Sequence, residues 1–160
     1  MHKHTLAATT LAVAAAASTG SLATRRRAPS WYARLVKPRY VPSPGVFPVA
    51  WTALYADIAA TSAVAIDRLR AEGRHDEARN YVVALSANLI LNAGWSWLFF
   101  KYRKLGASTV GAAVLAASCA DLTRRAVVAD PRAGAVLAPY ALWCAFATAM
   151  SGHIWVLNRR

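Results

Sequence analysis

Five apolar segments, each about as long as a membrane crossing, constrain the fold of this chain more than any other feature. An α-helix rises about 1.5 Å per residue, so about 20 apolar residues span the ~30 Å hydrocarbon core of a bilayer. The segments lie at about residues 5–24, 46–66, 81–100, 107–128 and 133–157. They predict an all-α, single-domain bundle of five transmembrane helices over residues 1–160, with a long loop between the first two helices.

The charged residues support a membrane protein. Hydrophobic residues make up 57% of the chain and charged residues only 16%, which is unusually apolar for a soluble domain. The net charge of +12 would suit a nucleic-acid partner if the cations formed one face. They fall instead in short clusters between the apolar segments, as in proteins that cross the membrane several times. A lipid bilayer is therefore expected as a partner, and nucleic acid is not.

The distribution of Lys and Arg also predicts the orientation in the membrane. The N-terminus, the second loop and the fourth loop together hold 8 of the 19 cations. The first loop, the third loop and the C-terminus hold the other 11. The first loop and the C-terminus are therefore expected on the cytoplasmic side.

The first segment has an alternative interpretation. Lys3, the apolar run and "SLA" at Ser21–Ala23 also fit a secretory signal peptide with its cleavage site. The cluster Arg25–Arg27 follows directly, and cations in that position resist translocation. A retained helix is the favoured interpretation.

Three other features bear on how the helices pack. Asp57 lies inside the second segment, where a hydrogen bond to a neighbouring helix is favoured over a proton-linked role. Asp121 and Arg124-Arg125 predict that the fourth helix ends near Leu122 or frays beyond it. Alanines repeat every four residues in the last two segments and predict close helix packing or a homodimer interface; they are Ala112, Ala116, Ala120, Ala141, Ala145 and Ala149.

Motifs for hydrolytic, phosphate-binding or metal chemistry are absent from the sequence, so no metal site is predicted. His153 has the chemistry to ligate a haem-type iron, but a packed or interfacial histidine is the favoured interpretation. Cys119 and Cys144 both lie in apolar segments and are expected to be small core residues, not a disulfide framework.

Aromatic and amide residues share helix faces in three of the segments. The third segment places Asn88, Asn92, Trp95 and Phe99 on one face. The second and fifth segments do the same with two sets: Trp51, Tyr55 and Ile58, and Tyr140, Trp143, Ala147 and Met150. Faces of this kind predict a cavity for a large, flat, apolar ligand, held by ring stacking and shape.

Four stretches together resemble one known family. They are "WYARLVKP", "FPVAWTALY", "LNAGWSWLFF" and "PYALWCAFATAM…IWVLN", in that order between Trp31 and Asn158. Their order and spacing are similar to those of the TspO/MBR family. These are the tryptophan-rich sensory proteins of bacteria, related to the mitochondrial translocator protein, also called the peripheral benzodiazepine receptor.

The resemblance implies a five-helix membrane bundle, commonly dimeric, in a bacterial cell membrane. It implies a pocket for porphyrins such as protoporphyrin IX and, in many members, for isoquinoline or benzodiazepine drugs. Porphyrin would be a ligand, and no cofactor is required. Carried over by position, the resemblance implies three lid residues in the first loop and seven pocket residues on the helices: Trp31, Tyr32, Pro42, Phe47, Trp51, Asn92, Trp95, Phe99, Trp143 and Ala147.

The sequence departs from the family pattern at several positions. Tyr40 stands where the family often has tryptophan, and Ser43 stands where it often has a second proline. Gly152 stands near the place of the tyrosine in the cholesterol motif proposed for animal members. Sterol recognition of that kind is therefore not expected.

The leading hypothesis is a membrane receptor or carrier for porphyrin-type tetrapyrroles, with a sensory or transport role. The ligand would stack on Trp51, Trp95 and Trp143 and contact the Asn92 amide. Its propionates would pair with cations of the first loop; these are Arg34, Lys37 and Arg39. One alternative is light- and oxygen-dependent porphyrin breakdown, in which the resemblance implicates Trp51 and Trp143. The other is a regulator that responds to tetrapyrrole or stress through a partner protein.

Overall fold

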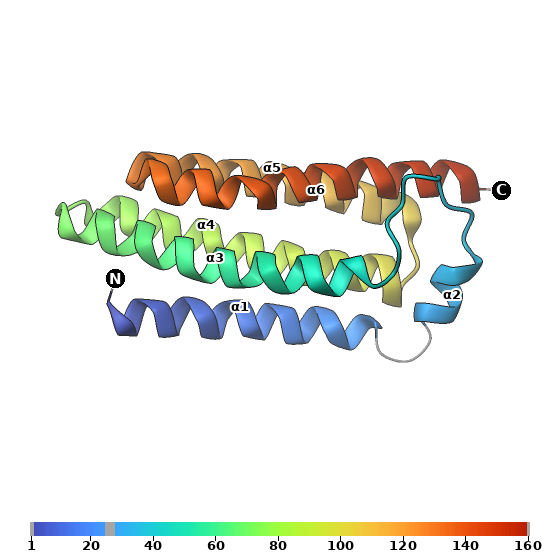
Figure 1. Cartoon of the computed structure of the whole chain (residues 1–160), viewed down its shortest axis with the longest axis horizontal. Coiled ribbons are helices and arrows are strands. Elements are labelled where there is room, and N and C mark those ends of the chain that lie inside the picture. Colours follow the sequence, from blue (N-terminus) through green and yellow to red (C-terminus); the bar gives the residue numbers. More distant parts are fainter. Residues whose placement is uncertain (1, 25–27, 160) are drawn as a thin grey trace.

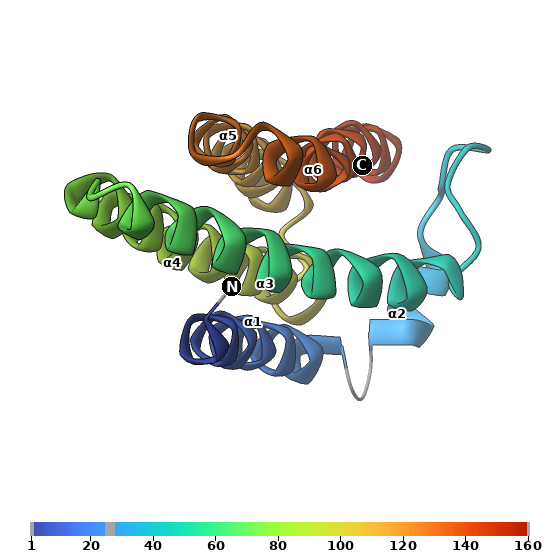
Figure 2. The same cartoon turned by 60° about the vertical axis from the view of Figure 1, so that its left-hand side comes forward.

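The computed structural model describes residues 2–24 and 28–159 and arranges its helices in three layers (Figure 1). The first layer is α1, the second holds α3 and α4, and the third holds α5 and α6; the turned view shows the same order (Figure 2). The elements are α1 Lys3–Thr24, α2 Ala28–Arg34, α3 Val46–Ala71, α4 His75–Ser96, a π-helical turn η1 Trp97–Lys101, α5 Leu105–Ala129 and α6 Pro131–Asn158.

Five of the described helices are long and apolar enough to cross a membrane. They are α1, α3, α4 with η1, α5 and α6. The prediction of an all-α bundle of five membrane-spanning helices is confirmed, and the chain is an integral, multi-pass membrane protein. Since α1 packs against both α3 and α4, it is part of the bundle. Its retention after synthesis stays a prediction. The Thr9 hydroxyl, for example, donates a hydrogen bond to the carbonyl of Ala59 on α3 at 2.9 Å.

The helices extend further than hydropathy predicted. The third span begins at His75 and not near residue 81, because its first turn is polar and exposed and lies at the end of the bundle. For the fourth span, two ends were considered, near Leu122 or beyond it, and the structure shows the second. Asp121 pairs with Arg124 at 2.7 Å and with Arg125 at 2.5 Å along the helix surface, so α5 continues past these charges to Ala129.

Part of the predicted first loop is helical. The short helix α2 runs from Ala28 to Arg34 and ends four residues before Pro38. The Lys37 ammonium closes this helix by donating hydrogen bonds to the carbonyls of Tyr32 at 2.7 Å and Leu35 at 3.0 Å. A cation at the C-terminus of a helix also interacts favourably with the helix dipole. The ammonium of Lys37 is therefore occupied by backbone carbonyls of the loop itself.

Helices α5 and α6 form the most extensive pair in the bundle. Buried residues alternate at spacings of three and four along both helices, as in the seam of a coiled coil. On α5 they are Ser108, Ala112, Leu115, Cys119, Leu122, Ala126 and Ala129, and on α6 they include Ala133, Leu137, Tyr140, Cys144, Ser151 and Ile154. The predicted alanine ridges only partly match this seam: Ala112 lies in it, whereas Ala145 and Ala149 are exposed. A homodimer stays a prediction.

The turn between α5 and α6 is very tight. Only Asp130 separates the two helices, and its carboxylate accepts the backbone N–H of Arg132 at 2.8 Å and of Ala133 at 3.0 Å. Gly134 then passes close to α5: a Cβ at this position would lie 2.3 Å from Val127 Cγ2 and 2.6 Å from the Val127 backbone. Only glycine allows this approach.

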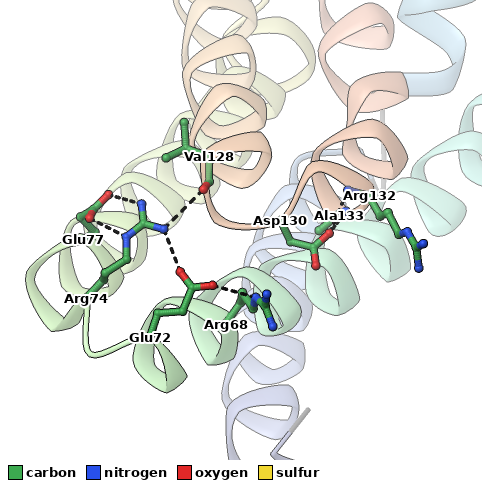
Figure 3. A network of polar contacts seen from close by, with 8 residues as sticks. All are labelled: Arg68, Glu72, Arg74, Glu77, Val128, Asp130, Arg132 and Ala133. Carbon is green, nitrogen blue, oxygen red and sulfur yellow. Dashed lines mark hydrogen bonds and ion pairs between the residues drawn. The ribbon is translucent and has the colours of Figure 1, made fainter.

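Arg74 ties the α3–α4 turn to the end of α5 (Figure 3). Its guanidinium donates two hydrogen bonds to Glu77, both at 2.7 Å, one to Glu72 at 3.0 Å and one to the carbonyl of Val128 at 3.5 Å. The hydrogen bonds to Glu77 and Glu72 raise the pKa of Arg74. Arg68 extends the network with an ion pair to Glu72 at 2.9 Å (Figure 3).

The two ends of the bundle differ in charge. Six of the seven acids lie toward the end that holds the α3–α4 and α5–α6 turns: Asp67, Glu72, Asp76, Glu77, Asp121 and Asp130. The opposite end, which carries α2, holds described cations only: Arg34, Lys37, Arg39, Lys101, Arg103, Lys104 and Arg159. Arg25–Arg27 and Arg160, which entered the orientation argument, lie outside the described residues. The orientation in the membrane stays a prediction.

Candidate ligand site

Asn92 joins three helices at the centre of the bundle. Its side chain is 2% exposed, its Oδ1 accepts the hydroxyl of Tyr55 on α3 at 2.9 Å, and its Nδ2 donates to the hydroxyl of Tyr140 on α6 at 3.1 Å. A buried amide requires such partners, because an unsatisfied polar group is costly away from water. Asn92 was predicted to contact the ligand, whereas its oxygen and nitrogen are both engaged by tyrosines here.

Asn88 continues this polar network toward α5. Its Oδ1 accepts the Tyr140 hydroxyl at 2.8 Å, and its Nδ2 donates to Ser118 Oγ at 3.1 Å and to Cys119 Sγ at 3.4 Å. Cys119 in turn lies 3.4 Å from Cys144 Sγ on α6. The two amides of the third span therefore form a connected, internal polar layer.

Aromatic rings from α3 and α6 lie on one side of this layer. We name six of them the α3/α6 cluster: Phe47, Trp51, Tyr55, Tyr140, Trp143 and Phe146. Trp143 meets Phe47 at 6.1 Å between ring centroids, and Trp51 meets Tyr140 at 6.5 Å, both edge to face. Trp51, Trp143 and Phe47 are only half-buried. They present large apolar faces that the surrounding helices do not fully cover.

A second group of rings lies where α2 packs on η1. We name it the lid cluster: Trp31, Tyr32, Trp95, Phe99 and Phe100. Trp95 stacks on Phe99 with centroids 5.4 Å apart, and Trp31 meets the same Phe99 edge to face at 5.7 Å. Partial burial raises the pKa of Tyr32. The sequence-predicted site residues thus divide between two clusters.

The π-helical turn η1 shapes the lid cluster. It places Phe99 and Phe100 side by side, with ring centroids 4.9 Å apart, and closes with a hydrogen bond from the Tyr102 N–H to the carbonyl of Trp97 at 2.9 Å. Arg103 follows with a positive φ of 54°, which is strained for a residue with a side chain. Its guanidinium lies 5.5 Å from the centre of the Trp31 ring, a cation–π contact that joins η1 to α2.

The loop between α2 and α3 is attached to α6. Asn158 at the end of α6 accepts the Val36 N–H at 3.0 Å and donates to the Val36 carbonyl at 2.8 Å. The Tyr40 hydroxyl lies 3.4 Å from His153 Nδ1, and the Tyr40 ring also contacts Phe146. Figure 1 shows this loop crossing from α2 to α6 before it returns to α3. His153, considered as an iron ligand, is therefore a contact of the loop.

Two site residues predicted from the resemblance belong to neither aromatic cluster. Pro42 is half-buried in the loop, and Ala147 is half-buried on α6 one turn after Trp143. Asp57 is also half-buried, and its Oδ1 has no hydrogen-bond partner among the described residues. Among the described residues, Asp57 Oδ1 therefore does not form the hydrogen bond to a neighbouring helix that the sequence predicted.

The structure adds Tyr40, Phe100, Phe146 and Asn158 to the site, none of which was among the predicted site residues. Asn158 had a usable signal, since it is a polar residue at the end of the apolar stretch "IWVLN". Tyr40 and Phe146 lacked one, because they meet only when the loop folds back on α6.

Five spans, a first loop folded onto the bundle and aromatic clusters beneath it define a polytopic membrane protein with a candidate site for an apolar ligand. The chain belongs to the TspO/MBR family, whose profile matches residues 8–156. Over 153 residues it is 32% identical to the tryptophan-rich protein TspO of Archaeoglobus fulgidus, covering 96% of each chain. The tryptophan-rich sensory protein of Cereibacter sphaeroides is 28% identical, covering 92% of this chain and 87% of that one. The human translocator protein is 29% identical, covering 78% and 73%.

Proposed function

We propose that this protein binds porphyrin-type tetrapyrroles at the α3/α6 cluster, beneath the first loop, as a membrane receptor or carrier. The observation that carries the proposal is the set of half-buried rings of Phe47, Trp51 and Trp143. Large flat rings bind a flat macrocycle by stacking and by burial of apolar area. Relatives named as a sensory protein and a translocator protein agree with a sensory or transport role.

The charge of the loop suits the carboxylates of such a ligand. Arg34 and Arg39 are exposed on the loop, and no acid occurs in the chain between residues 1 and 56. Propionates at the rim of a porphyrin would therefore meet cations without competition from protein carboxylates. Lys37 is a weaker candidate than the other two, because its ammonium is engaged by the carbonyls of Tyr32 and Leu35.

Binding requires some rearrangement of the site. The rings of the α3/α6 cluster contact one another in two groups: Phe47, Trp143 and Phe146 form one, and Trp51, Tyr55 and Tyr140 form the other. The loop is held to α6 by Asn158 and Tyr40. A macrocycle would replace ring–ring contacts, while Asn92 supports Tyr55 and Tyr140 from behind. In this arrangement Asn92 positions the tyrosines and does not contact the ligand itself.

The test is a titration of the purified protein in detergent with protoporphyrin IX, followed by porphyrin absorbance and by quenching of tryptophan fluorescence. Saturable micromolar binding is expected, weakened at least several-fold in the Trp51→Phe/Trp143→Phe double variant. Trp155→Phe is the matched control, since Trp155 is exposed, packs over Gly106 of α5 and is not part of the α3/α6 cluster. Absence of saturable binding, or equal binding by the double variant, would refute the proposal.

Light- and oxygen-dependent porphyrin breakdown is a second candidate. Trp51 and Trp143 are both half-buried members of the α3/α6 cluster, so an oxidisable ring from each of two helices would lie against the ligand. Illumination of the bound complex under oxygen, followed by porphyrin absorbance, distinguishes breakdown from binding alone. The wild type and the double variant are compared at the same fraction of bound porphyrin. If both lose porphyrin absorbance at the same rate, the breakdown is a reaction of the porphyrin itself and does not use the two tryptophans.

A further inference from the structure

Two free thiols face each other inside the bundle. Cys119 on α5 and Cys144 on α6 occupy the coiled-coil-like seam, are 0% and 1% exposed, and have their sulfurs 3.4 Å apart. A disulfide bond is about 2.05 Å long, so bond formation requires the sulfurs to approach by about 1.3 Å. Side-chain rotation within a tight helix pair supplies a movement of this size.

The two sulfurs have different surroundings. Asn88 Nδ2 donates a hydrogen bond to Cys119 Sγ at 3.4 Å, and the same nitrogen donates to Ser118 Oγ at 3.1 Å. A donor aimed at sulfur stabilises negative charge there, and the thiolate is the reactive form of cysteine. Cys119 is therefore the better nucleophile of the pair.

A lateral hollow lies near this site on the outside of the bundle. It lies between α4 and α5, has a volume of about 360 Å³, and is lined by Asn80, Val83, Ala84, Ala87, Ser118, Asp121 and Arg125. Ser118 directly precedes Cys119 and shares the Asn88 amide with it. The hollow has room for a small uncharged molecule beside Ser118, one residue before the buried Cys119, which does not itself line the hollow.

We propose that Cys119 and Cys144 form a redox-active dithiol that reduces small hydroperoxides and is converted to an intramolecular disulfide between α5 and α6. Cys119 Sγ attacks a peroxide oxygen, the O–O bond breaks, and the leaving alkoxide takes the thiol proton as an alcohol. Cys119 is then a sulfenic acid. Cys144 Sγ attacks this sulfur, the S–O bond breaks, and hydroxide leaves with the Cys144 proton as water. The two sulfurs lose two electrons, and the hydroperoxide gains them.

The test treats the full-length protein in lipid nanodiscs with tert-butyl hydroperoxide, then unfolds it in SDS and labels its thiols with a maleimide. We expect loss of both labelling sites and an intact mass lower by two hydrogens, both reversed by a dithiol reductant. Retention of both thiols, addition of oxygen without loss of hydrogen, or a disulfide between two chains would overturn the proposal.

Single variants test the order of the two steps. Cys144→Ser should trap the Cys119 sulfenic acid, which dimedone labels, whereas Cys119→Ser should give several-fold less labelling at Cys144. The reverse pattern would overturn the assignment of Cys119 as the attacking residue.

The hollow is tested by filling it. Ala87→Trp should slow oxidation of the dithiol several-fold, while Ala113→Trp on the exposed surface of α5 should leave the rate unchanged. Equal rates in these two variants would overturn the route through the hollow. Thermal unfolding of each variant establishes that it is folded before its rate is compared.

Discussion

The side chain of Asn158 forms two hydrogen bonds with the backbone of Val36: its Oδ1 accepts the Val36 N–H at 3.0 Å, and its Nδ2 donates to the Val36 carbonyl at 2.8 Å. The last residue of α6 thereby holds the start of the loop between α2 and α3, across 122 positions of the sequence. A side-chain amide is well suited to this role, because it offers a donor and an acceptor in one plane.

Asn158→Ala should open this loop. Loss of two hydrogen bonds of about 0.5–1.5 kcal/mol each corresponds to roughly a fivefold to hundredfold larger open population. The rate of tryptic cleavage at Arg34 and Arg39, measured in detergent, should rise accordingly. Arg159→Ala is the control, and equal cleavage of both variants would mean that the Asn158 contact does not hold the loop.

Asn92→Leu should destabilise the bundle. The substitution leaves the hydroxyl of Tyr55 without its amide partner, whereas the hydroxyl of Tyr140 keeps its hydrogen bond to Asn88. The expected cost is about 1–3 kcal/mol. Thermal unfolding in detergent measures the effect. Ser86→Ala, at an exposed position of the same helix, should be close to neutral. Restored stability on adding Tyr55→Phe would identify the orphaned hydroxyl as the cause, and an unchanged Asn92→Leu midpoint would contradict the network.

Gly134→Ala should destabilise the bundle, although it adds only one methyl group. The added methyl would lie 2.3 Å from Val127 Cγ2 and 2.6 Å from the backbone of α5, so the helices must separate at a cost of about 1–3 kcal/mol. Gly94→Ala is a matched control on α4, where a Cβ would meet nothing within 4 Å. It should be neutral or stabilising, since alanine favours a helix more than glycine does. Equal unfolding temperatures for the two variants would argue against the close approach.

Asp130 should make stability depend on pH. Hydrogen bonds from the backbone N–H groups of Ala133 and Arg132 lower the pKa of its carboxyl below that of the unfolded chain. The stabilisation is therefore fully present above the unfolded pKa of about 3.9 and is lost as the pH falls through the lower, folded pKa. Unfolding temperatures measured from pH 7 to pH 3 should fall less in Asp130→Ser, which keeps a capping oxygen without the charge. Identical pH profiles would show that the charge plays no part.

The spans were predictable from sequence because hydropathy reports each helix separately. The buried face of the third span was predictable for a similar reason: Asn88, Asn92, Trp95 and Phe99 follow the helical repeat, and all four are buried. Residues far apart in the chain carried no comparable signal. The partners of Asn92 lie 37 and 48 positions away, so its engagement by Tyr55 and Tyr140 became visible only in the folded bundle.

Helix ends and the lid were harder to predict for local reasons. Hydropathy ends a helix at its first charges, whereas ion pairs such as Asp121 with Arg125 let α5 continue. The first loop was predicted as one long loop, because the seven-residue helix α2 gave no apolar repeat long enough to detect. The role of Lys37 depended on this helix, because its ammonium caps the helix carbonyls.

The single-residue connection at Asp130 has a consequence for biogenesis. With Gly134 pressed against Val127, the last two spans have no slack to enter the bilayer one after the other. We therefore expect the last two spans to enter the bilayer together as a helical hairpin, with the turn and its cations Arg124, Arg125 and Arg132 on one side of the membrane.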